Sequence, residues 1–166
     1  MKSLKFTMAL LVFLLVFKND RVGADGHLRI IGGQKAKIED HPWIVYLYET
    51  SEGYFCGGSL INADTVITAA HCFDSYPPTH IIAGNIDRNN VRDSIEIKNH
   101  KLHDYYNNKT YDYDIAILKL AKKVTFSKKI QPIQLPKQDY EVPAGTKVTT
   151  AGWGKTEVKI MYNIKV

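Results

Sequence analysis

Six short segments rich in β-branched and aromatic residues constrain the fold of this chain more than any other feature of its sequence. These candidate strands cover residues 43–49, 55–62, 65–70, 80–85, 94–102 and 114–120. Several alternate apolar and polar residues, as around Ile95 and Ile97, and turn-forming residues separate one segment from the next. Short strands without long helical patterns predict an all-β fold, either a closed antiparallel barrel or a sandwich.

A seventh candidate strand follows a longer connector. Residues 122–141 contain Pro132 and Pro136 among lysines and glutamines, as expected of a crossing between two units. The next segment, TKVTTAGWG at 146–154, has the composition of a strand. We expect it to open a second unit.

Length and charge exclude some classes of function. The chain has 166 residues, 45% of them hydrophobic and 23% charged, which is typical of a soluble globular protein. Five of the 22 basic and two of the 17 acidic side chains lie in residues 1–29, which leaves 17 basic and 15 acidic side chains for the rest. Because neither sign forms a long run, the sequence predicts no nucleic-acid partner.

The N-terminus has the layout of a secretory signal peptide. Lys2 and Lys5 precede an apolar run at 8–17 that is too short to span a bilayer comfortably, and the small residues VGA end at Ala24. We expect cleavage after Ala24, so that residues 1–24 are a signal peptide and the mature protein is secreted and extracellular. The alternative, a buried N-terminal strand or helix, explains these flanking residues less well. No membrane contact beyond targeting is expected.

The chain has only two cysteines, Cys56 and Cys72. In an oxidising compartment they are expected to form a disulfide. Their loop encloses fifteen residues, so the bond would add about 3 kcal/mol to stability on the chain-entropy model.

The segment DTVITAAHC, residues 64–72, ends an apolar run on a histidine. Taken alone, His71 could be a packed core residue, a metal ligand or a catalytic base. Two further histidines, His100 and His103 in HKLH, lie in a strand-like run without an acidic partner in helical register. The sequence therefore predicts no zinc site.

Five motifs in a fixed order reveal a family resemblance. The segments RIIGG, CGGSLI, TAAHC, DIAILKL and GWG, at these spacings, resemble the N-terminal part of trypsin-like serine proteases of the chymotrypsin fold. The resemblance covers nearly all of residues 29–154. It implies one six-stranded antiparallel Greek-key barrel and the first strand of a missing second barrel, with 30–154 as an incomplete peptidase domain.

The resemblance also assigns roles to individual residues. It makes His71 the general base, because an imidazole can take and return a proton at neutral pH. It makes Asp114 the carboxylate that orients His71 and stabilises its charged form. Asp104 and Asp112 lie nearby, but only Asp114 is in register with DIAILKL.

The motif RIIGG resembles an activation site. Cleavage between Arg29 and Ile30 would remove residues 25–29 as a propeptide and free the Ile30 ammonium, which in this family pairs with an aspartate beside the nucleophilic serine. No Gly-Asp-Ser-Gly segment occurs in the sequence, so the nucleophile and its oxyanion site are absent. As given, the chain is expected not to turn over peptide bonds.

Two functions remain open at this stage. The first is a secreted trypsin-like serine endopeptidase whose sequence is truncated before the serine; its full-length form would act on protein or peptide substrates and bind protease inhibitors. The alternative is a non-catalytic secreted homologue that acts as a binding or decoy protein. A small independent β-barrel module is a weaker third reading, because it would not need RIIGG.

The remaining features concern modification, metals and the tail. Asn108 begins the sequence Asn-Lys-Thr, a candidate N-glycosylation site. Asn85 follows Gly84 where calcium-binding relatives carry a glutamate, which argues against calcium, and no cofactor or metal is expected. Residues 155–166 form an atypical tail, rich in residues with A/T-rich codons, which suggests translation into an unspliced intron or a gene-model error.

Overall fold

The computed structural model describes residues 34–50, 55–87 and 91–154. The chain divides into two compact units, one of residues 36–140 and one that combines 1–35 with 141–166. Each unit is described by itself. The expected signal peptide (1–24), propeptide (25–29), Arg29–Ile30 cleavage site and atypical tail (155–166) all lie outside the described residues.

All six strands expected between residues 43 and 120 are present. They are β1 (Ile44–Tyr48), β2 (Phe55–Asn62), β3 (Thr65–Thr68), β4 (His80–Ala83), β5 (Ile95–Leu102) and β6 (Ala116–Leu120). The described residues also form three single-turn 3-10 helices: η1 (Ile38–Asp40), η2 (Ala70–Phe73) and η3 (Val91–Asp93). Each strand begins and ends within two residues of its expected bounds, and β3 and β4 each end two residues earlier than expected.

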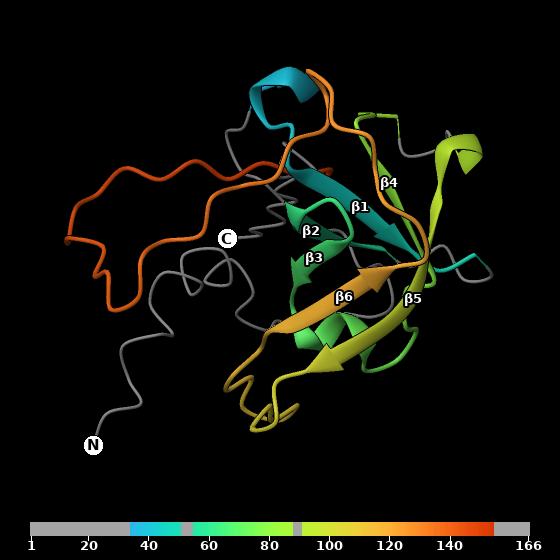
Figure 1. Cartoon of the computed structure of the whole chain (residues 1–166). Coiled ribbons are helices and arrows are strands. Elements are labelled where there is room, and N and C mark those ends of the chain that lie inside the picture. Colours follow the sequence, from blue (N-terminus) through green and yellow to red (C-terminus); the bar gives the residue numbers. More distant parts are fainter. Residues whose placement is uncertain (1–33, 51–54, 88–90, 155–166) are drawn as a thin grey trace, which may run out of the picture. The chain divides into compact units, whose positions relative to one another are not determined.

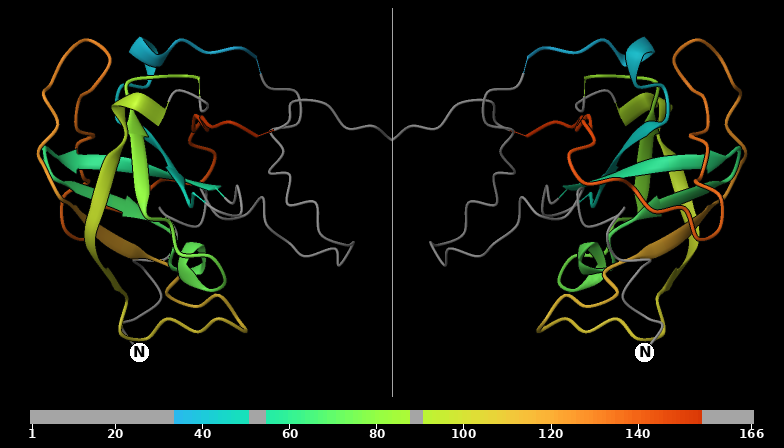
Figure 2. Two further views of the ribbon diagram at one scale, coloured as in Figure 1. Left: turned by 90° about the vertical axis from the view of Figure 1, so that its right-hand side faces the viewer. Right: turned by 90° about the vertical axis from the view of Figure 1, so that its left-hand side faces the viewer.

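The six strands form a closed antiparallel barrel in the order β1-β2-β3-β6-β5-β4 (Figure 1). Two three-stranded meanders, β1-β2-β3 and β4-β5-β6, join through the pairs β3–β6 and β1–β4. The two side views show the strands wrapping around a common interior (Figure 2). Closure leaves no sheet edge unpaired, so the barrel is confirmed and the sandwich is excluded.

The interior of the barrel holds the apolar residues of the alternating strands. β6 shows the pattern most simply, because its three buried residues alternate with two exposed ones. The largest fully buried side chains are Leu47, Leu60, Ile81, Ile82, Leu118, Val45 and Val66. Complete burial of each such side chain contributes about 1.5–3 kcal/mol, so this core stabilises the ends of the strands that carry the site.

The prediction of a seventh strand is wrong. Residues 146–154 contain no strand, and their unit shows instead a turn in which the amide and hydroxyl of Thr146 both donate to the carbonyl of Pro143. Gly145 supports this turn with a positive φ of 82°. A strand needs a hydrogen-bonded neighbour, and within the described residues none pairs with this segment. Composition alone therefore overestimated its tendency to form a strand.

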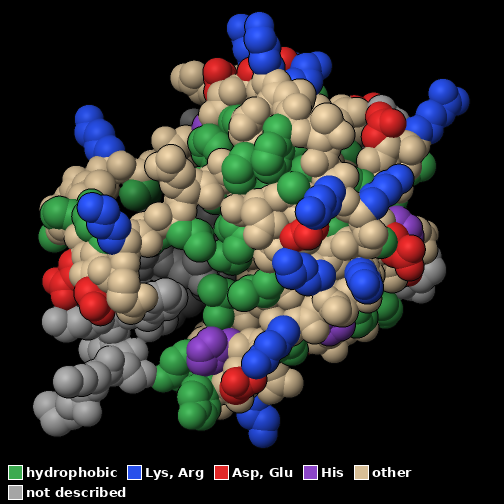
Figure 3. All heavy atoms as spheres, viewed as in Figure 1, with side chains coloured by type: hydrophobic (Ala, Val, Ile, Leu, Met, Phe, Trp, Pro, Cys, Tyr) green, Lys and Arg blue, Asp and Glu red, His purple; other side chains and the backbone are tan. Residues whose placement is uncertain are grey.

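The outer face over β5 and β6 is charged. Figure 3 shows Lys and Arg side chains there with Asp and Glu among them, so no large area of one sign forms on this face. In the described part of the chain, no helix is long and apolar enough to cross a membrane.

Candidate active site

The barrel register brings two distant segments together at one end of neighbouring strands. Thr68, the last residue of β3, pairs with Ala116, the first residue of β6. The chain turns into η2 after Thr68 and approaches Ala116 from the loop that precedes β6. His71 and Asp114, 43 residues apart in sequence, consequently lie beside each other.

Both oxygens of the Asp114 carboxylate bind His71. The backbone amide of His71 donates to Oδ1 at 2.8 Å, and Nδ1 of the His71 ring lies 2.7 Å from Oδ2. The Asp114 side chain is only 3% exposed, whereas that of His71 is 22% exposed. The carboxylate is therefore held inside the fold while the imidazole reaches the surface.

This geometry fixes the proton on the ring. An ionised carboxylate can only accept hydrogen bonds, so Nδ1 of His71 must donate to Asp114, and the lone pair of the neutral ring is then on Nε2. A second bond, from the His71 amide, keeps the carboxylate from rotating away. The arrangement suits an imidazole that accepts a proton at Nε2 and has its positive charge stabilised by a buried carboxylate.

The disulfide that was expected is present and supports the His71 turn. Cys56 in β2 is bonded to Cys72 in η2, with their Cα atoms 6.2 Å apart. Thr68 adds a second link to β2, because its hydroxyl donates to the carbonyl of Gly57 at 2.7 Å. The turn that carries His71 is thereby held on two sides, to β2 through these links and, through Asp114, to the loop that leads into β6.

The loop between β5 and β6 is also tied to the His71 turn. The hydroxyl of Tyr106 donates to Oδ2 of Asp74 at 2.8 Å, three residues after His71. Burial and this hydrogen bond both raise the pKa of Tyr106 above its ordinary value. This tie was not anticipated from the sequence, where Tyr106 is one tyrosine among several in a polar loop.

Aromatic rings brace the same loop around Asp114. Tyr111 contacts the His71 ring edge-on, with ring centroids 5.9 Å apart, and Tyr113 stacks on His103 at 4.7 Å. Tyr111 and Tyr113 both have positive φ angles, 57° and 53°, which are unfavourable for residues with a side chain. The ring contacts and hydrogen bonds of the loop offset that cost and hold Asp114 in place.

The other sequence candidates take separate places. Asp104 pairs with exposed Lys101 at 3.3 Å, and Asp112 accepts a hydrogen bond from the Thr110 hydroxyl, so neither binds His71 through an observed hydrogen bond. Asn108 is exposed. Of the histidines in HKLH, His100 is exposed, and its ring stacks on Phe73 with ring centroids 4.2 Å apart.

One cluster of metal-ligating atom types occurs among the described residues. Ligand-type atoms of Cys56, His71 and Cys72 lie within 4.8 Å of one another. Both sulfurs are joined in the disulfide, however, and a disulfide sulfur is not the thiolate that zinc binds. With the disulfide intact, the cluster does not have the donor set of a zinc site.

A closed six-stranded barrel that presents a buried aspartate and a partly exposed histidine at one end has the geometry of the histidine–aspartate half of a serine protease. Comparison with known proteins agrees. The family model described as Trypsin matches residues 30–163, so the chain belongs to the trypsin family. The match includes most of the segment 155–166 that looked atypical by sequence.

Individual relatives come from insects and mammals. The chain is 35% identical to a trypsin of Phaedon cochleariae over 93% of this chain and 62% of that protein. It is 41% identical to a trypsin of Sarcophaga bullata over 76% of this chain and 50% of that protein, and 37% identical to duodenase-1 of Bos taurus over 90% and 60%. The chain thus spans about half to three fifths of the length of these relatives.

A solved structure shows the same fold. The scabies mite inactivated protease paralogue S-D1 superimposes with a TM-score of 0.71 at 32% sequence identity, over 78% of this chain and 56% of that one. The expectation of a trypsin-type barrel is confirmed.

Proposed function

We propose that this chain is the N-terminal part of a secreted trypsin-like serine endopeptidase. The observation that carries the proposal is the double contact of Asp114 with His71, at 2.8 Å to the backbone amide and 2.7 Å to Nδ1. A histidine in the protein core for packing alone would not need a buried carboxylate aligned with both its amide and its ring. The family supports protein substrates and peptide-bond hydrolysis.

In this proposal, His71 is the general base and Asp114 orients it. Nε2 takes the proton of a serine hydroxyl as that oxygen attacks the scissile carbonyl, and returns the proton to the leaving amine. Asp114 stays ionised and stabilises the imidazolium between these steps. The serine and its oxyanion site would come from sequence beyond these 166 residues, which contain no Gly-Asp-Ser-Gly segment.

The proposal includes an activation step. Residues 1–24 direct secretion, residues 25–29 form a propeptide, and cleavage after Arg29 frees the amino group of Ile30. A buried ammonium without a partner costs several kcal/mol, so pairing of Ile30 with a carboxylate in the missing part makes cleavage a sharp switch. The 166-residue polypeptide alone lacks both that carboxylate and the nucleophile, and is inactive on this proposal.

Sequencing the transcript across the codon for Glu157 tests the proposal. We expect a message that continues to a Gly-Asp-Ser-Gly segment. Its product, after cleavage at Arg29, should hydrolyse a peptide ester, and the His71→Ala variant should lose this activity by several orders of magnitude. The 166-residue chain, cleaved in the same way, should show none. Hydrolysis by the short chain that depends on His71 would contradict the proposal.

A second function is favoured by one observation. The solved relative is itself described as an inactivated protease paralogue, so the barrel also occurs in a protein without catalysis. A spliced message that still ends at Val166 would make the non-catalytic homologue, a secreted binding or decoy protein, the better assignment. The intact His71–Asp114 pair speaks for the enzyme, because a binding protein has no chemical need of it.

A further inference from the structure

An open pocket lies between the loop that precedes β6 and the turn that follows His71. It is lined by Asp74, Leu102, Tyr105, Tyr106, Asn107 and Asn108 and has a volume of about 530 Å³. Neither His71 nor Asp114 lines it, so the pocket is separate from the pair described above. Enclosed sites for small organic groups have volumes of roughly 300–1,000 Å³. This pocket has a comparable volume but is open to solvent, so it can hold a group only against its wall.

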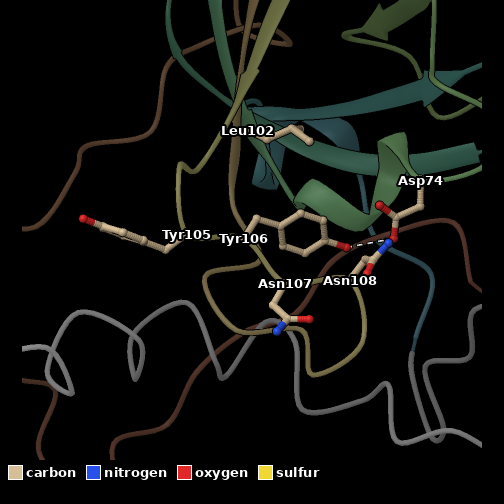
Figure 4. A pocket seen from close by; sticks show the side chains of 6 residues that line it. All are labelled: Asp74, Leu102, Tyr105, Tyr106, Asn107 and Asn108. Carbon is tan, nitrogen blue, oxygen red and sulfur yellow. Dashed lines mark hydrogen bonds between the residues drawn. The ribbon is translucent and has the colours of Figure 1, made fainter.

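The lining combines an aromatic ring with a carboxylate. In Figure 4 the ring of Tyr106 lies across the middle of the pocket with its hydroxyl directed to Asp74, whereas Tyr105 points away from them. Half-buried Leu102 extends the apolar wall. Asp74 is exposed and accepts one hydrogen bond from Tyr106, and a carboxylate has about four acceptor positions. A fitting group therefore has one apolar face and several O–H or N–H donors.

A sugar ring has both properties, and the sequence provides its attachment point at the pocket wall. Asn108 is exposed, lines the pocket and begins Asn-Lys-Thr, which occurs once in the 166 residues. The neighbouring Asn107 shapes the turn, because its side-chain oxygen Oδ1 accepts a hydrogen bond from the backbone amide of Lys109 at 2.9 Å. A group attached to Asn108 would be confined near the ring of Tyr106, which raises its effective concentration there.

We propose that Asn108 carries an N-linked glycan whose first sugar occupies this pocket, against the Tyr106 ring and hydrogen-bonded to Asp74. The proposal rests on the secretion included in the proposed function. In the linkage step, Nδ2 of Asn108 forms a bond to the anomeric carbon of an oligosaccharide carried on a lipid diphosphate. The anomeric C–O bond breaks, the diphosphate leaves with the bonding electron pair, and Nδ2 loses a proton. The sugar enters the pocket when the loop folds.

The site itself is tested by expressing the full chain in mammalian cells and measuring glycopeptide masses. We expect Asn108 to be occupied in the wild type and in Thr110→Ser, which keeps the acceptor sequence, and to be unoccupied in Thr110→Val. Retained protein in cell lysates serves as well as secreted protein, because the linkage forms before folding is complete. An unoccupied Asn108 in both fractions would overturn the proposal.

Placement of the sugar is tested by the rate at which peptide-N-glycanase releases the glycan. We expect release from the native protein to be at least tenfold slower than from the denatured protein, since one face of the first sugar packs against the Tyr106 ring. Tyr106→Leu, which removes the flat ring, should speed native release severalfold, and Tyr140→Leu, an exposed tyrosine outside the pocket, should not. If Tyr106→Leu does not fold, the wild-type ratio decides. Equal native and denatured rates would refute the placement and leave the pocket for another ligand.

Two versions of the chain separate this proposal from the proposed function. One carries its own residues 1–24, and the other carries the leader of an unrelated secreted protein in their place. Glycosylation only with the foreign leader would refute secretion by the native leader but support the Asn108 site. Secretion with either leader and no sugar on Asn108 would refute the site and leave the protease assignment untouched.

Discussion

Two adjacent glycines in β2 provide a sharp test of how tightly the barrel is packed. Gly58 is buried, and a Cβ added there would lie 2.8 Å from Cγ1 of Val66 and 2.9 Å from Cδ1 of Leu47. The backbone oxygen of Ile67 would be 3.1 Å away. At Gly57, by contrast, an added Cβ would meet no heavy atom of the described chain within 4 Å. One methyl group is therefore tested in two environments of the same strand.

The two substitutions are expected to change the free energy of unfolding in opposite directions. Inside a strand, alanine makes the folded state more stable than glycine does by about 0.5–1 kcal/mol, since alanine loses less backbone entropy on folding. At Gly57 this gain stands alone. At Gly58, overpacking costs about 1–3 kcal/mol, and the upper part of that range applies because Val66 and Leu47 are fully buried and cannot move aside. We expect Gly58→Ala to lower the free energy of unfolding by about 2 kcal/mol, and Gly57→Ala to raise it by about 0.5 kcal/mol.

Thermal and urea unfolding of the two variants and the wild type measures this difference. A gap of about 2.5 kcal/mol corresponds to melting temperatures about 10 °C apart for a domain near 100 residues. Both variants should keep the Cys56–Cys72 bond, which a thiol assay checks. Equal melting temperatures, or a Gly58→Ala protein as stable as the wild type, would show that the barrel relaxes around position 58 and that the packing argument fails.

Three further predictions concern other contacts. Tyr106→Phe should lower the free energy of unfolding by about 1 kcal/mol, because the hydrogen bond to Asp74 is lost. Burial and this hydrogen bond raise the folded pKa of Tyr106 above the ordinary tyrosine pKa of about 10, so the stability that its hydroxyl adds is complete below that pH and is lost as the pH rises above it. In ultraviolet titration, Tyr106→Phe should therefore remove a tyrosine that ionises only above that pH. The hydrogen bond from Lys119 lowers the pKa of Asp64, so the stability it adds is present above pH of about 4 and fades below, and Asp64→Asn should flatten the decline of melting temperature in acid. Gly84→Ala should lower the free energy of unfolding, measured in urea, by about 2–4 kcal/mol. The φ angle of Gly84 is 70°, and the new Cβ would lie 2.6 Å from Cγ1 of Ile130 in the connector.

Strand positions could be predicted because each strand carries its own signal. Alternation in 94–102 and 114–120 marks β5 and β6 regardless of their neighbours. The same local rules failed at 146–154, where strand-like composition has no partner strand in the described residues. They also extended β3 through Ala70, although the chain turns into η2 to place His71. Local pattern reports what a segment can form, and hydrogen-bonding partners decide whether it does.

The candidate site was predictable only in part, for a similar reason. His71 and Asp114 came from motif order, since nothing in their local sequence shows that β3 pairs with β6. The Tyr106–Asp74 bond and the contact of Tyr111 with His71 came from the structure alone. Each joins residues more than 30 positions apart through a loop of irregular shape, and no periodic signal describes such a loop.

The position of the disulfide has a consequence for the order of events during synthesis. Cys56 and Cys72 both belong to the β1-β2-β3 meander and its following turn, whereas Asp114 emerges only with β6. Translating the intervening chain takes several seconds at about 5–20 residues per second, and disulfides begin to form on that timescale. With secretion as in the proposed function, the bond can close while the polypeptide is still being made, so that His71 is restrained before Asp114 has joined the fold. Ribosome-bound chains stalled with Cys72 outside the ribosome and β6 still inside it should then already resist thiol alkylation, and full reactivity of both cysteines at that stage would argue that closure of the barrel comes first.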